Sequence, residues 1–151
     1  MGIADDAVEV RAEGWRTLAA LHGIIESRLE RALAEEHRIS VVEYTVLDAL
    51  SRQHGWHMRM QQLARAAALS ASATTRLVNR LEERDLLTRV LCQDDRRGIY
   101  TELTPAGEAL LRQARPTHDA ALAEALELAR QTPEVAPLVE ALAGIPVLSR
   151  S

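Results

Sequence analysis

Two short segments with helical spacing, separated by only three residues, constrain the fold of this chain more than any other feature. Residues 61–67 repeat apolar side chains at the spacing of a short amphipathic helix. A second helix is expected from the N-cap candidate Ser70 to about Arg84, and its apolar residues also recur at helical intervals. Two short helices joined by so tight a connection indicate a helix-turn-helix.

A β-hairpin is predicted directly after these helices. Residues 86–91 and 99–103 favour strands, and the polar segment 93–98 between them favours a turn. A further short strand is expected near residues 56–60, ahead of the first helix of the pair. Because a hairpin after a helix-turn-helix is a wing, residues 39–103 are predicted to form a winged helix-turn-helix.

Helical segments flank this central region on both sides. Residues 8–36 repeat apolar side chains at steps of three, four or seven, which predicts a long amphipathic helix. A capping box predicts another helix over residues 41–53. After the wing, helices are expected over residues 104–130 and about 134–143, with Pro116 kinking or breaking the first of them.

The chain is therefore predicted to be mainly α-helical with a small β-wing. Residues 39–103 would form the winged helix-turn-helix lobe, and residues 1–38 with 104–151 would form a helical platform. The platform segments carry more apolar surface than one small domain needs, which favours self-association into a homodimer. A larger monomeric helical core is the alternative.

Positive charge is concentrated in the central region. The whole chain has a net charge of −4, which argues against a protein that coats nucleic acid through its overall charge. Residues 52–100, however, include nine arginines and five acidic residues, which gives this region a net charge of +4. The rest of the chain has a net charge of −8. The predicted lobe thus holds the basic part of an acidic protein.

The second helix of the pair presents a polar stripe opposite its apolar side, formed by Ser72, Thr75, Arg76 and Asn79. Arginine can pair bidentately with guanine and asparagine with adenine, while serine and threonine reach bases or phosphates. By itself, such a stripe is more typical of a solvated helix face. Its position before a basic wing favours insertion into the major groove of double-stranded DNA.

Further residues extend this predicted DNA-binding surface. Arg80 and Arg84 continue from the stripe at i,i+4 spacing, where they would contact phosphate or pair with nearby acidic residues. Arg96 and Arg97 lie at the tip of the predicted hairpin, where they would enter a narrow minor groove. We expect these residues, together with Ser70 at the start of the helix, to contact DNA.

Three segments resemble the signature of the MarR family of transcriptional regulators: Leu-Glu-Glu-Arg-Asp-Leu-Leu-Thr-Arg at 81–89, Asp-Asp-Arg-Arg at 94–97 and Leu-Thr-Pro-Ala-Gly at 103–107. The resemblance implies a two-fold dimer with interlocking terminal helices, and a protein that usually represses transcription from a pseudo-palindromic operator. It also implies that Asp95 buttresses the wing and that Arg97 enters the minor groove. Asp85 stands where family members commonly carry glycine, which implies a local difference at the end of the recognition helix.

The resemblance also implies a small-molecule effector that changes the spacing of the two recognition helices. Inducers of the family usually enter a crevice between the platform and the DNA-binding lobe, and four residues are candidates to line it: Trp15, Arg16, His22 and Tyr44. A structural role is the alternative for each. Trp15 is similar to the first-helix tryptophan of urate-responsive members, but Thr45 replaces their acidic residue, which argues against urate.

Zinc-responsive or redox-responsive regulation is an alternative to this effector. His54 and His57 have metal-compatible spacing, and the other three histidines would add ligands only if folding gathered them. No compact Cys/His motif is present, so no metal and no cofactor are expected. Cys92, the only cysteine, lies near the wing, whereas hydroperoxide-sensing members of the MarR family carry theirs in the first helix.

The sequence argues against an enzyme and against a membrane protein. No nucleophile, phosphate-binding loop or metal motif of an enzyme is visible. Charges interrupt the apolar stretches well before the ~20 residues of a membrane span, and the N-terminal residues lack the pattern of a signal peptide, so a cytoplasmic protein is expected. A winged-helix module that binds proteins instead of DNA is the alternative function, favoured by the acidic net charge.

Overall fold

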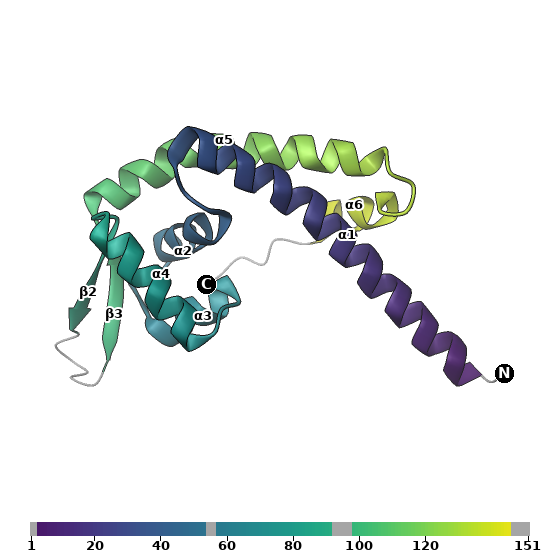
Figure 1. The fold of residues 1–151 in the computed structure, drawn as a ribbon, viewed down its shortest axis with the longest axis horizontal. Helices are drawn as coiled ribbons and strands as arrows, with labels where there is room; N and C mark the ends of the chain where they lie inside the picture. The colour runs from purple at the N-terminus through teal and green to yellow at the C-terminus, as the bar shows by residue number, and fades with distance from the viewer. Residues whose placement is uncertain (1–2, 54–56, 92–97, 146–151) are drawn as a thin grey trace. The chain divides into compact units, whose positions relative to one another are not determined.

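The computed structural model describes residues 3–53, 57–91 and 98–145. It confirms a mainly helical chain with a small antiparallel β-sheet (Figure 1). The chain separates into two compact units, of which one is residues 32–118 and the other combines residues 1–31 with 119–151. The first unit contains the predicted lobe, and the role of the second in dimerisation stays a prediction.

The described helices and strands are α1 (Ile3–His37), α2 (Val41–Ser51), β1 (His57–Arg59), α3 (Met60–Ala67), α4 (Ala71–Glu83), β2 (Leu87–Leu91), β3 (Ile99–Leu103), α5 (Pro105–Arg130) and α6 (Ala136–Ala143). Their bounds lie close to the predicted ones. The helix α5 is not broken at Pro116, because a proline removes a single backbone donor and the helix continues on both sides of it. Among the described residues, no helix has the length and apolar character needed to cross a membrane.

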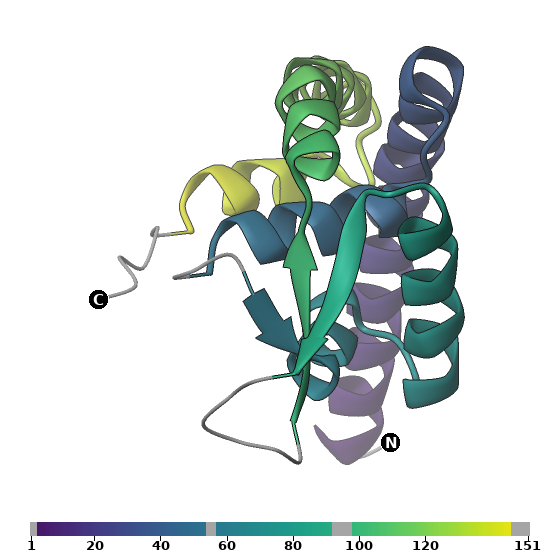
Figure 2. The same cartoon turned by 90° about the vertical axis from the view of Figure 1, so that its left-hand side faces the viewer.

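The three strands form one antiparallel sheet in the order β1-β3-β2. β2 and β3 pair as the predicted hairpin, with Leu87 opposite Leu103. β1 lies along the other edge of β3, where the hydroxyl of the buried Thr101 donates to the carbonyl oxygen of Met58 at 3.1 Å. Figure 2 shows α4 beside β2, so this helix and the hairpin belong to one packed body.

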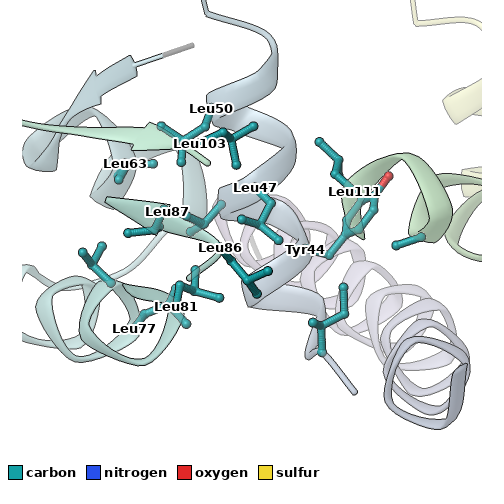
Figure 3. Close-up of a cluster of buried hydrophobic side chains, with 14 of the residues drawn as sticks. Tyr44, Leu47, Leu50, Leu63, Leu77, Leu81, Leu86, Leu87, Leu103 and Leu111 are labelled. Carbon is teal, nitrogen blue, oxygen red and sulfur yellow. The ribbon is translucent and has the colours of Figure 1, made fainter. Parts of the chain in front are cut away.

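A core of leucine side chains holds residues 32–118 together. Side chains from α2, α3, α4, the hairpin strands and α5 converge on it (Figure 3). The fully buried leucines of this core are Leu33, Leu47, Leu50, Leu63, Leu77, Leu81, Leu87 and Leu111. Burying one such side chain stabilises the fold by about 1.5–3 kcal/mol. Because Leu77 and Leu81 anchor one side of α4 in this core, the opposite side of the helix faces solvent.

Gly107, in the first turn of α5, allows that helix to approach the backbone that follows α4. A Cβ atom at this position would lie 1.9 Å from the carbonyl oxygen of Leu86. Thr104 reinforces the contact, because its hydroxyl donates to the carbonyl oxygen of Asp85 at 2.5 Å and accepts from the Gly107 N–H at 3.0 Å. The segment 103–107 therefore ties the start of α5 to the end of α4.

The second unit consists of the first part of α1, the last part of α5, and α6. Its buried cluster contains Leu21, Ala129, Val135 and Val139, and α6 lies beside α1 (Figure 1). Large apolar side chains of this unit nevertheless face solvent, namely Val8, Val10, Trp15, Leu18, Leu128, Leu142 and Ile145. These exposed side chains lie within the segments predicted to form the platform, and the platform itself stays a prediction.

Candidate nucleic-acid interface

The structure confirms the helix-turn-helix, formed by α3 and α4. Ala68 makes the turn with a left-handed φ of 54°, and the N–H of Leu69 donates to the carbonyl oxygen of Ala64 at 2.9 Å. Ser70 caps α4 as predicted, because its hydroxyl accepts from the N–H of Ala73 at 3.2 Å. Local hydrogen bonds therefore define the end of α3 and the start of α4.

The polar stripe of α4 faces solvent. All four members, and Arg80 beside them, are exposed, whereas the other side of the helix is buried at Thr74, Leu77, Val78 and Leu81. Neither Arg76 nor Arg80 forms an ion pair with another residue of the described segments. Their guanidinium groups are therefore available to an anionic partner such as DNA.

Arg84 differs from the other basic residues of α4. It is the C-cap residue, and its Nη1 donates to the carbonyl oxygen of Arg38 at 3.0 Å. The same nitrogen lies 3.3 Å from Oε2 of Glu43 in α2. Arg84 therefore pairs with an acidic residue far away in the sequence, and not with one of its neighbours along the helix.

Asp85 follows the end of α4 with a left-handed φ of 58°. The N–H of Asp85 donates to the carbonyl oxygen of Glu82, and the N–H of Leu86 to that of Leu81, both at 2.9 Å. This is the Schellman pattern, in which glycine is the usual residue. Asp85 thus adopts a left-handed backbone conformation that costs a non-glycine residue about 1 kcal/mol.

Sequence reasoning did not single out Arg89 of β2, whose side chain contacts α4 in the structure. Its guanidinium contacts the side-chain oxygen of Asn79 and lies 3.5 Å from Oε1 of Glu82, while its backbone N–H donates to Glu82 at 3.1 Å. Arg89 therefore joins the wing to α4. Its position at the end of the segment 81–89 was the available signal, but its partners depend on how β2 packs beside α4.

A cavity of about 530 Å³ lies where α3, α4 and the hairpin strands meet. It is lined by Met60, Gln61, Ala64, Arg65, Ala71, Thr74, Thr75, Arg89 and Ile99. In the part of the chain that the structure describes, the buried Nε of Arg89 has no hydrogen-bond partner. A mostly apolar wall with a few polar groups is typical of small-molecule sites.

The four predicted effector residues lie in different units. Trp15, Arg16 and His22 belong to α1, where Trp15 is 68% exposed, and hydrogen bonds to Glu13 and Glu9 raise the pKa of the Arg16 guanidinium. Tyr44 is buried in the other unit. Their shared role in effector binding stays a prediction.

Three histidines of the described segments have separate local partners. His22 lies 2.8 Å from Glu26, Nε2 of His37 lies 2.8 Å from the hydroxyl of Thr117, and His118 stacks on Tyr44 with ring centroids 4.3 Å apart. His57 and Arg59 both contact the ring of Tyr100. No three His, Cys, Asp or Glu side chains among the described residues form a group that could hold a metal ion.

Several predicted residues lie outside the described residues. These are the wing residues Asp95, Arg96 and Arg97, the cysteine Cys92, and His54. Their predicted roles in the minor groove, in redox sensing and in metal binding stay predictions.

Comparison with known proteins supports the resemblance found in the sequence. Residues 39–98, which span the helix-turn-helix and most of the wing, match the model of the MarR family. The HTH-type transcriptional regulator MhqR of Bacillus subtilis is 29% identical over 93 residues, which are 62% of this chain and 63% of that protein. This chain thus spans about three fifths of the length of the curated relatives it matches, 63% and 61%. These matches with regulators support the expectation that the chain is not an enzyme.

Two solved structures extend the similarity to nearly the whole chain. AbsC, a MarR family transcriptional regulator from Streptomyces coelicolor, has a TM-score of 0.69 and 29% identity, with coverage of 87% of this chain and 93% of its own. A second MarR family regulator from the same organism, solved in complex with DNA, has a TM-score of 0.71 and 25% identity, with coverage of 95% and 88%. Residues 39–98 therefore match the model of the MarR family, and the chain has the winged-helix fold of the MarR family regulators that it resembles.

Proposed function

We propose that this protein is a transcriptional repressor that binds double-stranded DNA as a homodimer, with one α4 helix from each protomer in the major groove. The exposed stripe of α4 carries the proposal, and Arg76 at its centre forms no ion pair with a residue of the described segments. The DNA-bound relative from Streptomyces coelicolor supports it. Ser70, Ser72, Thr75 and Asn79 would contact bases or phosphates beside Arg76, and Arg80 would contact phosphate.

Selection of bound fragments from a genomic library, followed by footprinting, tests this proposal. We expect a protected pseudo-palindrome whose half-sites lie one helical turn apart, about 10 base pairs, because two recognition helices related by two-fold symmetry read it. Affinity should fall steeply as the salt concentration rises, since arginine–phosphate contacts release counterions. A protein-interaction module would enrich no sequence, and binding that does not depend on salt would contradict arginine–phosphate contacts.

The apolar side chains exposed on the second unit support the dimer. Large apolar side chains left exposed to solvent favour an interaction site when they gather in a patch. Leu18 is 48% exposed on α1, and Leu128 is 40% exposed on α5. A second copy of this chain would bury such surface in a self-complementary interface.

We therefore expect the purified protein to sediment as a dimer at micromolar concentration. The variant Leu18→Asp should shift the equilibrium towards monomer, because it places a charge on the proposed interface. Leu91→Asp is the matched control, since Leu91 is also exposed, at 74%, but lies in β2. Sedimentation equilibrium measures all three proteins, and a monomeric parent protein would overturn the proposed dimer.

We also propose that the cavity between α3, α4 and the hairpin receives a small effector with a carboxylate group. The Nε of Arg89, which has no hydrogen-bond partner among the described residues, would donate to the carboxylate, and the apolar wall would receive a ring. Because residues of α4 line this cavity, an occupant would alter the helix that is proposed to read DNA.

Benzoate is the probe for this effector site. We expect calorimetry to detect binding to the parent protein and roughly 10- to 100-fold weaker binding to Arg89→Met, because a hydrogen bond to a charged group is worth about 1.5–3 kcal/mol. Arg80→Met is the control, since Arg80 lies on α4 but does not line the cavity. If only Trp15→Ala changes the affinity for benzoate, the effector site includes Trp15, one of the four residues that the sequence predicted to line a crevice between platform and lobe.

A further inference from the structure

The guanidinium of Arg84 connects the end of α4 with the turn between α1 and α2. Its Nη1 donates to the carbonyl oxygen of Arg38, a residue with a left-handed φ of 56° in that turn, at 3.0 Å. The same nitrogen lies 3.3 Å from Oε2 of Glu43. Two elements that are more than forty residues apart in the sequence are thus joined by one side chain.

The acidic partner is held firmly in place. The side chain of Glu43 is only 14% exposed, and its other oxygen, Oε1, accepts from the N–H of Ser40 at 3.1 Å in the capping box of α2. A carboxylate that is largely removed from water and fixed by a backbone donor orients its cationic partner more strictly than a surface carboxylate does. Arg84 is therefore a fixed link, in contrast to Arg76 and Arg80, which have no such partner among the described residues.

We propose that Arg84 is a positioning residue, which sets the orientation of α4 through Glu43 and the α1–α2 turn and does not itself contact phosphate. This inference rests on the proposed function, in which α4 enters the major groove. Bases can be read only when the helix is presented at the correct angle, and a looser helix end lowers the fraction of molecules that can bind. Loss of the link should therefore weaken operator binding without removing a phosphate contact.

A double-mutant cycle with Arg84→Met and Glu43→Gln tests the proposal. Operator affinity is measured by fluorescence anisotropy over a range of salt concentrations. The fraction of each protein that can bind DNA is determined first by titration, so that a partly unfolded variant is not mistaken for one with weak affinity. We expect Arg84→Met to weaken binding by about tenfold, and the double variant to be no weaker than Arg84→Met alone, because contacting residues are energetically coupled. The logarithmic salt slope should equal that of the parent protein.

Glu43→Gln alone provides the sharpest test. Glutamine can still accept from the Ser40 N–H in the capping box, so α2 keeps its cap. The substitution makes the lobe more positive, so a purely electrostatic effect would strengthen DNA binding. A positioning role for the pair predicts weaker binding instead, and it remains testable if Arg84→Met does not fold.

Arg80→Met is the matched control for a phosphate contact. It should reduce the magnitude of the logarithmic salt slope by about 0.9, the value for one phosphate contact in duplex DNA. The same slope change in Arg84→Met, or tighter binding by Glu43→Gln, would overturn the positioning role while leaving the proposed function intact. If the parent protein selects no DNA at all, the proposed function and this inference both fail.

Discussion

Arg76→Ala is expected to weaken binding to the best operator by ~1–3 kcal/mol and to relax the preference at one base pair. Arg76 is exposed on α4, and no ion pair with a described residue holds its guanidinium away from DNA. A bidentate pair with guanine discriminates against the other bases, so its loss should alter the preferred sequence as well as the affinity. Binding-site selection with the parent and the variant measures both effects.

Arg97→Ala is the comparison for this result. A side chain that enters the minor groove responds to groove width and potential, so its removal should weaken binding to many sequences and reduce preference mainly in A·T-rich flanks. The two variants therefore separate reading of base edges from reading of groove shape. If Arg76→Ala leaves affinity and base preference unchanged, Arg76 does not read the bases, and the reading role falls to Ser72, Thr75 or Asn79.

Gly107→Ala is expected to lower the free energy of unfolding by about 3 kcal/mol or more, which corresponds to a fall in Tm of roughly 10 °C. The added Cβ would meet the carbonyl oxygen of Leu86 at 1.9 Å, and a backbone atom cannot move aside as a flexible side chain can. The start of α5 or the end of α4 must shift, which breaks the hydrogen bonds of Thr104. Urea unfolding followed by circular dichroism measures the change.

Gly144→Ala is the matched control for this substitution. A Cβ at Gly144 would lie 3.6 Å from the carbonyl oxygen of Ala141, an ordinary contact, and the backbone φ of −91° suits any residue. Its effect should stay within about 0.5 kcal/mol. Equal stability of the two variants would mean that the close approach of α5 to Leu86 is not required for the fold.

Much of the fold was predictable because its signals are local. Ser40 and Ser70 mark helix starts, and the structure places both side chains in capping hydrogen bonds. The helical periodicity of the apolar residues in α4 predicted which side of this helix would be buried against the core. The predicted break at Pro116 is wrong, because the surrounding residues of α5 outweigh the local preference of proline against a helix interior, and the alternative of a kink stays a prediction.

The proposed site was only partly predictable for a physical reason. Exposure of Ser72, Thr75 and Arg76 follows from helical periodicity, which is a property of neighbouring residues. The pairing of Arg89 with Asn79 and Glu82 depends on how a strand lies against a helix. The spacing of residues along the sequence does not predict how β2 packs against α4.

The sequence by itself determined the helix-turn-helix, the hairpin and the polar face of α4, because periodicity, capping residues and turn residues act over a few positions. Only the tertiary structure decided that β1 pairs with β3, that Arg84 is held by Glu43, and that α5 approaches Leu86 so closely that Gly107 is needed. These contacts join residues distant in the chain. The geometry of these contacts is set when the leucine core packs and brings the elements together. A local sequence pattern therefore does not predict this geometry.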